Sequence, residues 1–502
     1  MASTDTASTP PKQGLSTLVL RNALVLVVAQ VAVIPLALLM NAVMGRYLGP
    51  ANFGAFYLVS TYVGTAFLLI EWGQGNTLPA LIAKQRERAA VFLGSALAFR
   101  AIAVPVVFLL VGTGCWLLGY TENFELLLAM FFVAMAIASA ALACQDASRG
   151  FERTDIVAYA TVGTQLLMVV LIVPTVLLGG QLPAVVMATA CANLIVLVLV
   201  WRGVRTMGLT RLSVDRSVLK QLVSDGVPFF FFALTLRLQP NIDALYLSRL
   251  APEEVVGWYA AAEKLKGVLV FPASALVSAL YPTMCRLFVS DSEGYRRTAQ
   301  TAIEISALAV VPVAIGAYLY ADLGIAIYSK QAYGPAADNL RMLAPFIFMV
   351  YISMPLGACI LAAGRSRIWT SVQALCIVIS LVFDPLLIPW FQQRTGNGGL
   401  GVCAAVVLAE LMMVIAGVVL MPKGVFDRQL LLGLARLGVA GGAMFGVGHL
   451  LSGISPFLAA PIAVLTYLAT LRAIGGLKAD QLQLFKDIVS RKAKRAPAPP
   501  QA

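Results

Sequence analysis

The sequence predicts an all-α polytopic membrane protein with about fourteen transmembrane helices. Composition is the first indication, because 60% of the 502 residues are hydrophobic and only 12% are charged, against about 25% charged residues in soluble proteins. The mean hydropathy of +0.87 agrees with this class. Length is the second indication, because apolar runs recur along the whole chain, each long enough to cross a hydrocarbon core about 30 Å thick.

The apolar runs are separated by short connections that are polar or contain glycine and proline. The first run follows a polar segment and lacks a small-residue cleavage site, so we expect a retained helix and not a signal peptide. The run at 432–451 is the least regular, because Arg436 lies near its start and glycines crowd it. The predicted spans are 18–44, 53–76, 91–118, 125–145, 156–179, 184–201, 222–248, 255–283, 301–321, 341–363, 369–390, 400–421, 432–451 and 457–474.

Lysines and arginines gather in alternate connections. One set holds Arg149, Arg202 and Arg286 among many others, whereas the other set holds few basic residues, such as Arg46 and Arg249. Because basic loops stay in the cytoplasm, we expect a multi-pass membrane protein with both termini in the cytoplasm. This asymmetry accounts for the net charge of +12 without a nucleic-acid partner, and we expect none.

Two pairs of connections indicate an internal repeat. The hairpin Arg46-Tyr-Leu-Gly-Pro-Ala-Asn-Phe-Gly54 and the connection from Arg249 to Tyr259 both run from an arginine through a proline to a glycine with an aromatic residue nearby. Gly150-Phe-Glu-Arg153 similarly matches Gly364-Arg-Ser-Arg367. Corresponding helices are displaced by six, an even number, so the two halves share one orientation about an axis along the membrane normal.

The predicted organisation follows from this repeat and from the composition of the chain ends. After the last span, apolar residues on one helical face and several lysines and arginines predict an amphipathic tail attracted to anionic membrane lipids. The predicted parts are a cytoplasmic polar tail at 1–17, an N-terminal lobe at 18–203, a linker at 204–221, a C-terminal lobe at 222–421, two further helices at 432–474 and a basic cytoplasmic tail at 475–502.

The spans 222–248 and 255–283 carry charged and amide side chains inside their apolar runs. A charge near the bilayer centre costs about 2.5–3.5 kcal/mol on insertion scales, so such side chains must face protein or water. Arg237 lies near the middle of its span, and Pro240 weakens the helix beside it. The predicted substrate-binding residues of a central cavity are Arg237, Lys264, Arg100, Asn241, Gln239, Asn41 and Gln30, and the residues suited to ion coupling are Glu71, Asp243 and Glu410.

Several of these charges have simpler explanations, which the sequence leaves open. Arg100 could reach cytoplasmic phosphates along its aliphatic stem. Asp243 could pair with Arg249, and Glu263 could form a structural pair with Lys266, three residues further along the helix. The seven cysteines show no metal-binding or disulfide spacing, and we expect them to be small buried hydrophobic residues.

The sequence contains no P-loop, HExxH motif, metal-ligand cluster or nucleophile elbow. The connections are too short to fold a catalytic domain, since most hold fewer than about twenty residues. We therefore expect a protein that is not an enzyme and that needs no cofactor or metal.

The hairpin Gly45-Arg-Tyr-Leu-Gly-Pro-Ala-Asn-Phe-Gly54, its apolar flanks and the layout of residues 15–475 resemble the polysaccharide transporters of the multidrug/oligosaccharidyl-lipid/polysaccharide exporter superfamily, among them the Wzx-type flippases. The resemblance implies a MATE-like fold, with two six-helix lobes around a central cavity that opens alternately to each side. It also implies that the two extra helices at 432–474 form a groove for a lipid tail, as in the lipid II flippases.

The resemblance and the central Arg237 together suggest a flippase of the bacterial inner (cytoplasmic) membrane. Its cargo would be a polyprenyl (pyro)phosphate that carries a short glycan, used in surface polysaccharide biosynthesis. Its partners would be the lipid-linked oligosaccharide, membrane lipids and polysaccharide polymerase or assembly proteins. The main alternative is a cation-coupled multidrug antiporter of the same superfamily, which would use the buried carboxylates. A third possibility is a non-transporting membrane scaffold, which the charges inside the helices disfavour.

Overall fold

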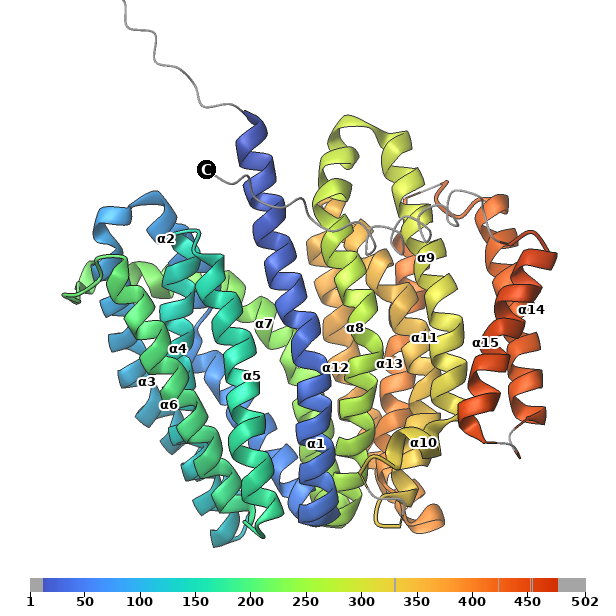
Figure 1. Cartoon of the computed structure of the whole chain (residues 1–502), viewed down its shortest axis with the longest axis horizontal. Coiled ribbons are helices and arrows are strands. Elements are labelled where there is room, and N and C mark those ends of the chain that lie inside the picture. The colour runs from blue at the N-terminus through green and yellow to red at the C-terminus, as the bar shows by residue number, and fades with distance from the viewer. Residues whose placement is uncertain (1–11, 329–330, 423, 452, 454, 477–502) are drawn as a thin grey trace, which may run out of the picture. The chain divides into compact units, whose positions relative to one another are not determined.

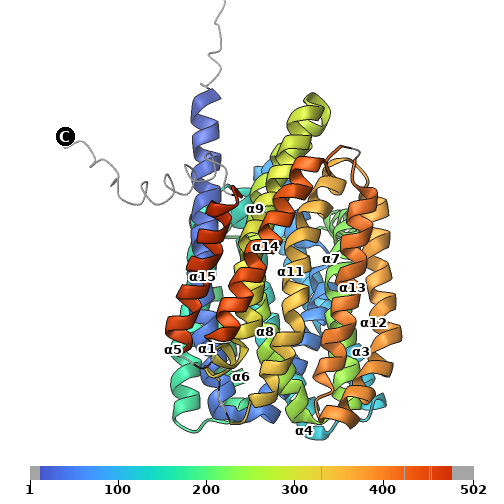
Figure 2. The ribbon, with the colours of Figure 1, turned by 90° about the vertical axis from the view of Figure 1, so that its right-hand side faces the viewer.

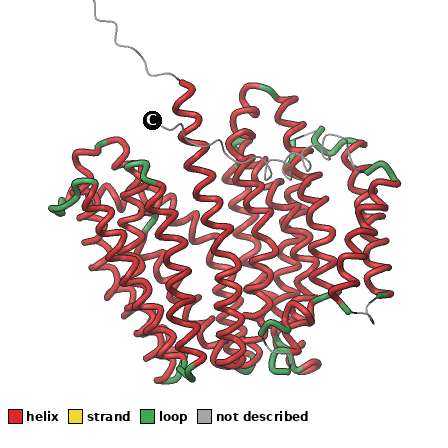
Figure 3. Tube along the Cα trace, in the orientation of Figure 1, coloured by secondary structure: helices red, strands yellow, loops and turns green. Residues whose placement is uncertain are grey.

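The computed structural model describes residues 12–328, 331–422, 424–451, 453 and 455–476. In these residues all regular structure is helical (Figure 3), and thirteen helical segments are long and apolar enough to cross a membrane. The all-α polytopic class is therefore confirmed. The predicted amphipathic tail after the last span lies outside the described residues, apart from its first two glycines.

The helices follow one another with short connections (Figure 1). They are α1 Lys12–Glu71, α2 Gln74–Lys84, a 3-10 turn Arg86–Arg88, α3 Ala89–Leu117, α4 Glu122–Gly150, α5 Thr154–Leu177, α6 Leu182–Thr206, α7 Arg216–Leu250, α8 Glu253–Ser290, α9 Ser292–Leu319, α10 Ala321–Ile325, α11 Gly334–Ala362, α12 Ser366–Thr395, α13 Gly399–Leu420, α14 Arg428–Leu450 and α15 Pro456–Ala473.

The long α1 contains the first predicted hairpin. Gly49 interrupts it with φ 77° and ψ 169°, a conformation that glycine adopts without the steric cost of a Cβ atom. The apolar segment Val28–Lys84 therefore holds two of the predicted spans, which explains why thirteen segments correspond to about fourteen predicted crossings. The helix also begins at Lys12, inside the predicted polar tail, because residues 12–17 contain no proline to stop it.

Contacts divide the chain into two compact units. Unit 1 comprises Met1–Val268, Ile325–Asn339 and Thr370–Ala409, and unit 2 comprises Leu269–Gly324, Leu340–Trp369 and Glu410–Ala502. Within unit 1, α7 packs on α1, α2 and α3. The division of the chain into two lobes and a linker stays a prediction.

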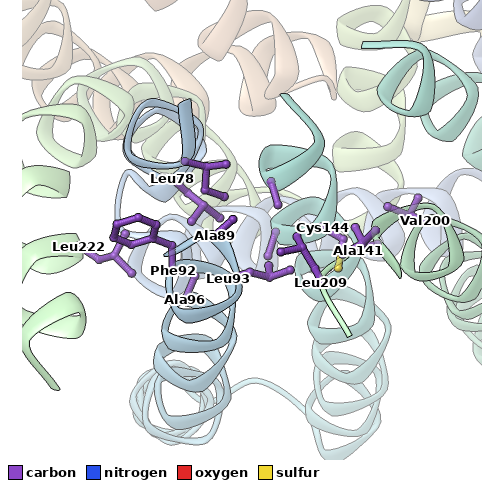
Figure 4. Packing of buried hydrophobic residues seen from close by; sticks show 14 of the residues in the cluster. Leu78, Ala89, Phe92, Leu93, Ala96, Ala141, Cys144, Val200, Leu209 and Leu222 are labelled. Atoms are coloured by element: carbon purple, nitrogen blue, oxygen red, sulfur yellow. The ribbon is translucent and has the colours of Figure 1, made fainter. Parts of the chain in front are cut away.

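Unit 1 has a dry core between α2, α3, α4 and α6 (Figure 4). Leu78, Phe92 and Leu93 meet Cys144 and Val200 there, and each of these side chains is buried. Five of the seven cysteines are buried like Cys144, and none of the seven forms a disulfide in the described structure. The expectation of small buried hydrophobic cysteines therefore holds for these five, whereas Cys191 is exposed and Cys285 is partly buried.

Unit 2 includes the two extra helices, α14 and α15, which pack beside α9 (Figure 2). A Cβ atom on Gly441 would lie 2.7 Å from Cγ1 of Val311 on α9. The glycines that made this segment look irregular therefore let α14 approach its neighbour, as small residues do between helices in membranes. Tyr467 of α15 donates a hydrogen bond to the carbonyl of Leu308 at 3.0 Å, which fixes the third helix of this group.

The hairpin after Gly49 packs against the start of α8, within unit 1. A Cβ atom on Gly54 would lie 2.7 Å from the backbone nitrogen of Gly257, and one on Gly257 would lie 2.0 Å from the carbonyl oxygen of Pro50. These are contacts between backbones, which cannot move aside as a flexible side chain can. The two predicted repeat motifs, which contain these glycines, thus meet in space.

Replacing Gly257 by valine should destabilise the protein by about 1–3 kcal/mol, because added side-chain atoms would push two backbones apart. The apparent Tm of the purified protein in detergent measures the effect. Gly267→Val is the matched control on the same helix, since a Cβ atom there would meet no neighbour within 4 Å. Equal melting temperatures for the two variants would show that the close approach is not needed for stability.

Candidate functional site

Two of the predicted cations lie against one face of α1, within unit 1. Tyr57, Gly64 and Glu71 follow one another at intervals of two helical turns, so they share this face; we call them the α1 stripe. The Lys264 Nζ lies 5.9 Å from the centre of the Tyr57 ring. A Cβ atom on Gly64 would lie 4.0 Å from Nη1 of Arg237, which places the guanidinium on the same face.

Arg237 and Lys264 carry positive charges that are not held in ion pairs. Arg237 is exposed and Lys264 is partly buried, and neither forms an ion pair within 4.0 Å among the described residues. Glu263, which acts electrostatically on Lys264, is bound to Lys266 at 2.6 Å, and this confirms the predicted pairing. The charges of Lys264 and Arg237 also act on one another.

The predicted amide side chains differ in their hydrogen bonds and in their burial. Asn241 donates a short hydrogen bond to the carbonyl of Arg237, whereas its own Oδ1 has no hydrogen-bond partner in the described structure. Gln239 is partly buried. On α1, Gln30 is exposed, and the Asn41 amide donates to the carbonyl of Ala37 at 2.7 Å.

Arg100 has surroundings that the sequence did not predict. It is only 4% exposed, with its Nε donating to Oε1 of Gln74 at 2.9 Å and its Nη1 donating to Oγ of Ser139 at 3.1 Å. Its Nη2 lies 3.7 Å from Oδ2 of Asp146, which also binds Arg149. The guanidinium is therefore held inside the packing of α2, α3 and α4, and it faces neither an open cavity nor cytoplasmic phosphates.

The described structure brings together two acids from distant parts of the chain. Asp243 on α7 and Asp384 on α12 are 2% and 0% exposed, and their carboxyl groups interact. Ser380, one turn before Asp384, faces Asp243. Both carboxylate oxygens of Asp384 lack a hydrogen-bond partner in the described part of the chain. Two adjacent buried carboxylates cannot both stay charged without a proton or cation to stabilise them.

Asp243 does not pair with Arg249, the alternative that the sequence left open. The Arg249 guanidinium lies 4.0 Å from the centre of the Tyr120 ring, and the Tyr120 hydroxyl shares a hydrogen bond of 2.8 Å with Ser248. The third predicted ion-coupling residue, Glu410, belongs to unit 2, where it accepts a short hydrogen bond from Ser353.

Comparison with known proteins gives both a family and a fold. A family model described as "Polysaccharide biosynthesis protein" matches residues 19–288, while no curated protein matches the chain. The chain resembles the lipid II flippase MurJ in an inward closed conformation, with a TM-score of 0.68 and 12% identity over 94% of this chain and 100% of that one.

Two MATE transporters are also similar. An inward-facing MATE family transporter of the MOP superfamily matches with a TM-score of 0.62 and 16% identity over 80% of this chain and 96% of that one. A Vibrio cholerae MATE transporter matches with a TM-score of 0.55 and 16% identity over 81% of this chain and 96% of that one. At these identities the likeness shows the fold, which is that of the MOP superfamily transporters.

Replacing Arg100 by methionine should destabilise the protein by about 3–5 kcal/mol, because Asp146 would remain buried with its charge poorly compensated. The combined variant Arg100→Met with Asp146→Asn should recover part of this loss, since it removes both charges. The apparent Tm in detergent and the yield of folded protein measure the effect. If Arg100→Met kept its stability but lost transport, Arg100 would instead have a substrate-binding role.

Proposed function

The chain belongs to the polysaccharide biosynthesis protein family, and from this membership we propose that it is a flippase. Its cargo would be an oligosaccharide linked to a polyprenyl (pyro)phosphate, moved across the bacterial cytoplasmic membrane by alternating access. The anionic headgroup of such a lipid cannot cross hydrocarbon unaided. A protein with the fold of the MOP transporters and a positively charged polar surface inside its spans suits this task.

The observation that carries the proposal is the positive charge of Arg237 and Lys264 along the α1 stripe, which no ion pair holds among the described residues. A guanidinium offers several donors in a fixed plane and binds phosphate oxygens in pairs, and an ammonium adds a compact charge. Two cations without ion pairs are therefore suited to hold one phosphate or diphosphate group.

The predicted amides suit the sugar part of the cargo. The Oδ1 of Asn241, one turn from Arg237, is buried and has no hydrogen-bond partner in the described structure, so it could accept a hydrogen bond from a sugar hydroxyl once a conformational change exposes it. Gln239 on α7, with Gln30 and Asn41 on α1, offers further amides for the glycan under this proposal.

The first of the two extra helices, α14, supports a place for the prenyl chain. Unit 2 contains a cavity of about 240 Å³ with an almost wholly apolar lining. The lining comes from α9, α11 and α14 and consists of Ala314, Ile315, Tyr318, Ala344, Pro345, Phe348 and Phe445. A cavity lined by apolar side chains suits a hydrocarbon chain and offers no hydrogen-bond partners to a sugar.

Energy for the transport would enter through the pair Asp243 and Asp384. Binding of a proton or a monovalent cation removes the repulsion between the two carboxylates, so occupancy of this pair would change the stability of the conformation that holds it. Glu71 and Glu410 are the other acids that we considered for coupling; Glu410 lies in unit 2. The basic connections would face the cytoplasm, together with both termini.

A cation-coupled multidrug antiporter remains the second candidate. The same acid pair favours it, as does the likeness to the MATE transporters. Charge at the α1 stripe distinguishes the two functions, because two cations repel a cationic drug and attract an anionic lipid head.

Replacing Arg237 by alanine should reduce flipping of a fluorescent polyprenyl-diphosphate-linked sugar in proteoliposomes by about tenfold or more, since a charge-assisted phosphate contact would be lost. Lys264→Ala should act in the same direction. Arg394→Ala is the matched control, since this arginine stacks on Trp390 at the end of α12. Normal flipping by Arg237→Ala would contradict the proposed role of the cations, and export of a cationic dye would favour the antiporter.

Replacing Asp384 by asparagine should abolish the dependence of flipping on an imposed proton or sodium gradient, because the pair could no longer gain a proton or bind a cation as before. Asp243→Asn should behave alike. Flipping measured with and without each gradient tests this expectation, and Asp322→Asn, outside the membrane-spanning helices on the short α10, serves as the control. Unchanged gradient dependence in both pair variants would exclude the pair as the coupling site.

A further inference from the structure

Glu71 is the last residue of α1, and the residues that follow it are held by contacts with α7. Directly after it, Trp72 and Gly73 adopt φ values of 47° and 71°, and α2 starts at Gln74. A tryptophan seldom adopts positive φ, so neighbouring contacts must hold it there. Its ring stacks on Phe230 of α7 with a centroid distance of 4.4 Å, and its Nε1 donates to the carbonyl of Val223 at 3.1 Å. These contacts tie the end of α1 to α7, the helix that carries Arg237.

From this point, α1 and α7 lie side by side in opposite directions. A Cβ atom on Gly73 would lie 2.4 Å from the carbonyl oxygen of Gly226, and further along the seam Gly64 lies against Arg237. Glu71 is two turns from Gly64 on the same face of α1. Its carboxylate is partly buried and acts electrostatically on both Arg237 and Arg100.

Two cations act on Glu71. Arg100, the first of them, is also bound by Asp146 at 3.7 Å and has its other donors occupied by Gln74 and Ser139. Arg237, the second, lies beside Gly64 on the same face of α1. Glu71 therefore compensates Arg100 and Arg237 together while no anion is bound.

We propose that Glu71 is a tethered competitor for the phosphate of the cargo. The inference rests on the proposed function and adds a residue that sets affinity and release. While the site is empty, the carboxylate reduces the cost of leaving Arg237 uncompensated in a low dielectric. When a phosphate arrives, the same carboxylate repels it and so limits its affinity. A transporter needs such a limit, because a headgroup that binds too tightly is not released on the far side.

Glu71→Gln tests the competition directly, because it keeps the shape and removes the charge. Binding of farnesyl diphosphate to the full-length protein in detergent would be measured by titration calorimetry. Glu71→Gln should bind about tenfold more tightly than the wild type, because one repulsive unit charge near the phosphate is gone. Glu71→Asp, which keeps the charge, should bind with an affinity near that of the wild type. Glu304→Gln on α9, in unit 2, is the matched control and should not change the affinity.

The combination with Arg237→Gln shows whether the effect passes through Arg237. In that background, Glu71→Gln should give a much smaller gain in affinity, because the two charges act as a pair. At saturating cargo in proteoliposomes, Glu71→Gln should flip more slowly than the wild type, since release becomes slower. If Glu71→Gln does not fold, as judged by its Tm, Glu71→Ala carries the same expectations.

The outcomes separate this inference from the proposed function. If Arg237→Gln lost binding but Glu71→Gln bound equally or more weakly than the wild type, the competitor role would be overturned and the flippase retained. If the wild type bound no farnesyl diphosphate and Arg237→Gln changed nothing, the proposed function itself would fail.

Discussion

A charged side chain inside a bilayer must find a partner or face water, and this requirement organises the site described here. Arg100 meets it with Asp146, and Lys266 meets it with Glu263. A smaller set of charged groups is not held in such pairs. Arg237 and Lys264 lack ion pairs, while Asp243 and Asp384 place two carboxyl groups together. The two cations are complementary to an anionic headgroup, and the two carboxyl groups are complementary to a small cation or a proton.

Close approach of helices provides the frame for these charges. Where no hydrophobic effect drives helices together in lipid, small residues let their backbones touch. Gly73 lies against Gly226, and Gly54 lies against Gly257, so the second half of α1 is held to α7 near one end and to α8 near the other. Between these contacts, Gly64 lies beside the Arg237 guanidinium. The second half of α1 thus packs closely against its neighbours at its two ends and lies against a polar side chain between them.

Much of the fold could be predicted from the sequence, because spans depend on local hydropathy and the hairpin at Gly49 on local turn chemistry. The pair of Glu263 and Lys266 was also predictable, since residues three apart on a helix are neighbours. The partners of Arg100 and Asp243 were not, because Asp146 and Asp384 lie on other helices and only tertiary packing brings them close. The positive φ of Trp72 was equally hidden, since Phe230 and Val223 hold it from far along the chain.

Positive charge at position 237 is expected to act on the cargo. Removing that charge and restoring it chemically tests this role. In a background with Cys191→Ser and Cys285→Ser, the variant Arg237→Cys would be assayed for flipping before and after modification with a cationic aminoethyl thiosulfonate or a neutral methyl analogue. We expect that the unmodified variant is inactive and that flipping returns with the cationic reagent alone. Equal recovery with the neutral reagent, or full activity before modification, would contradict it.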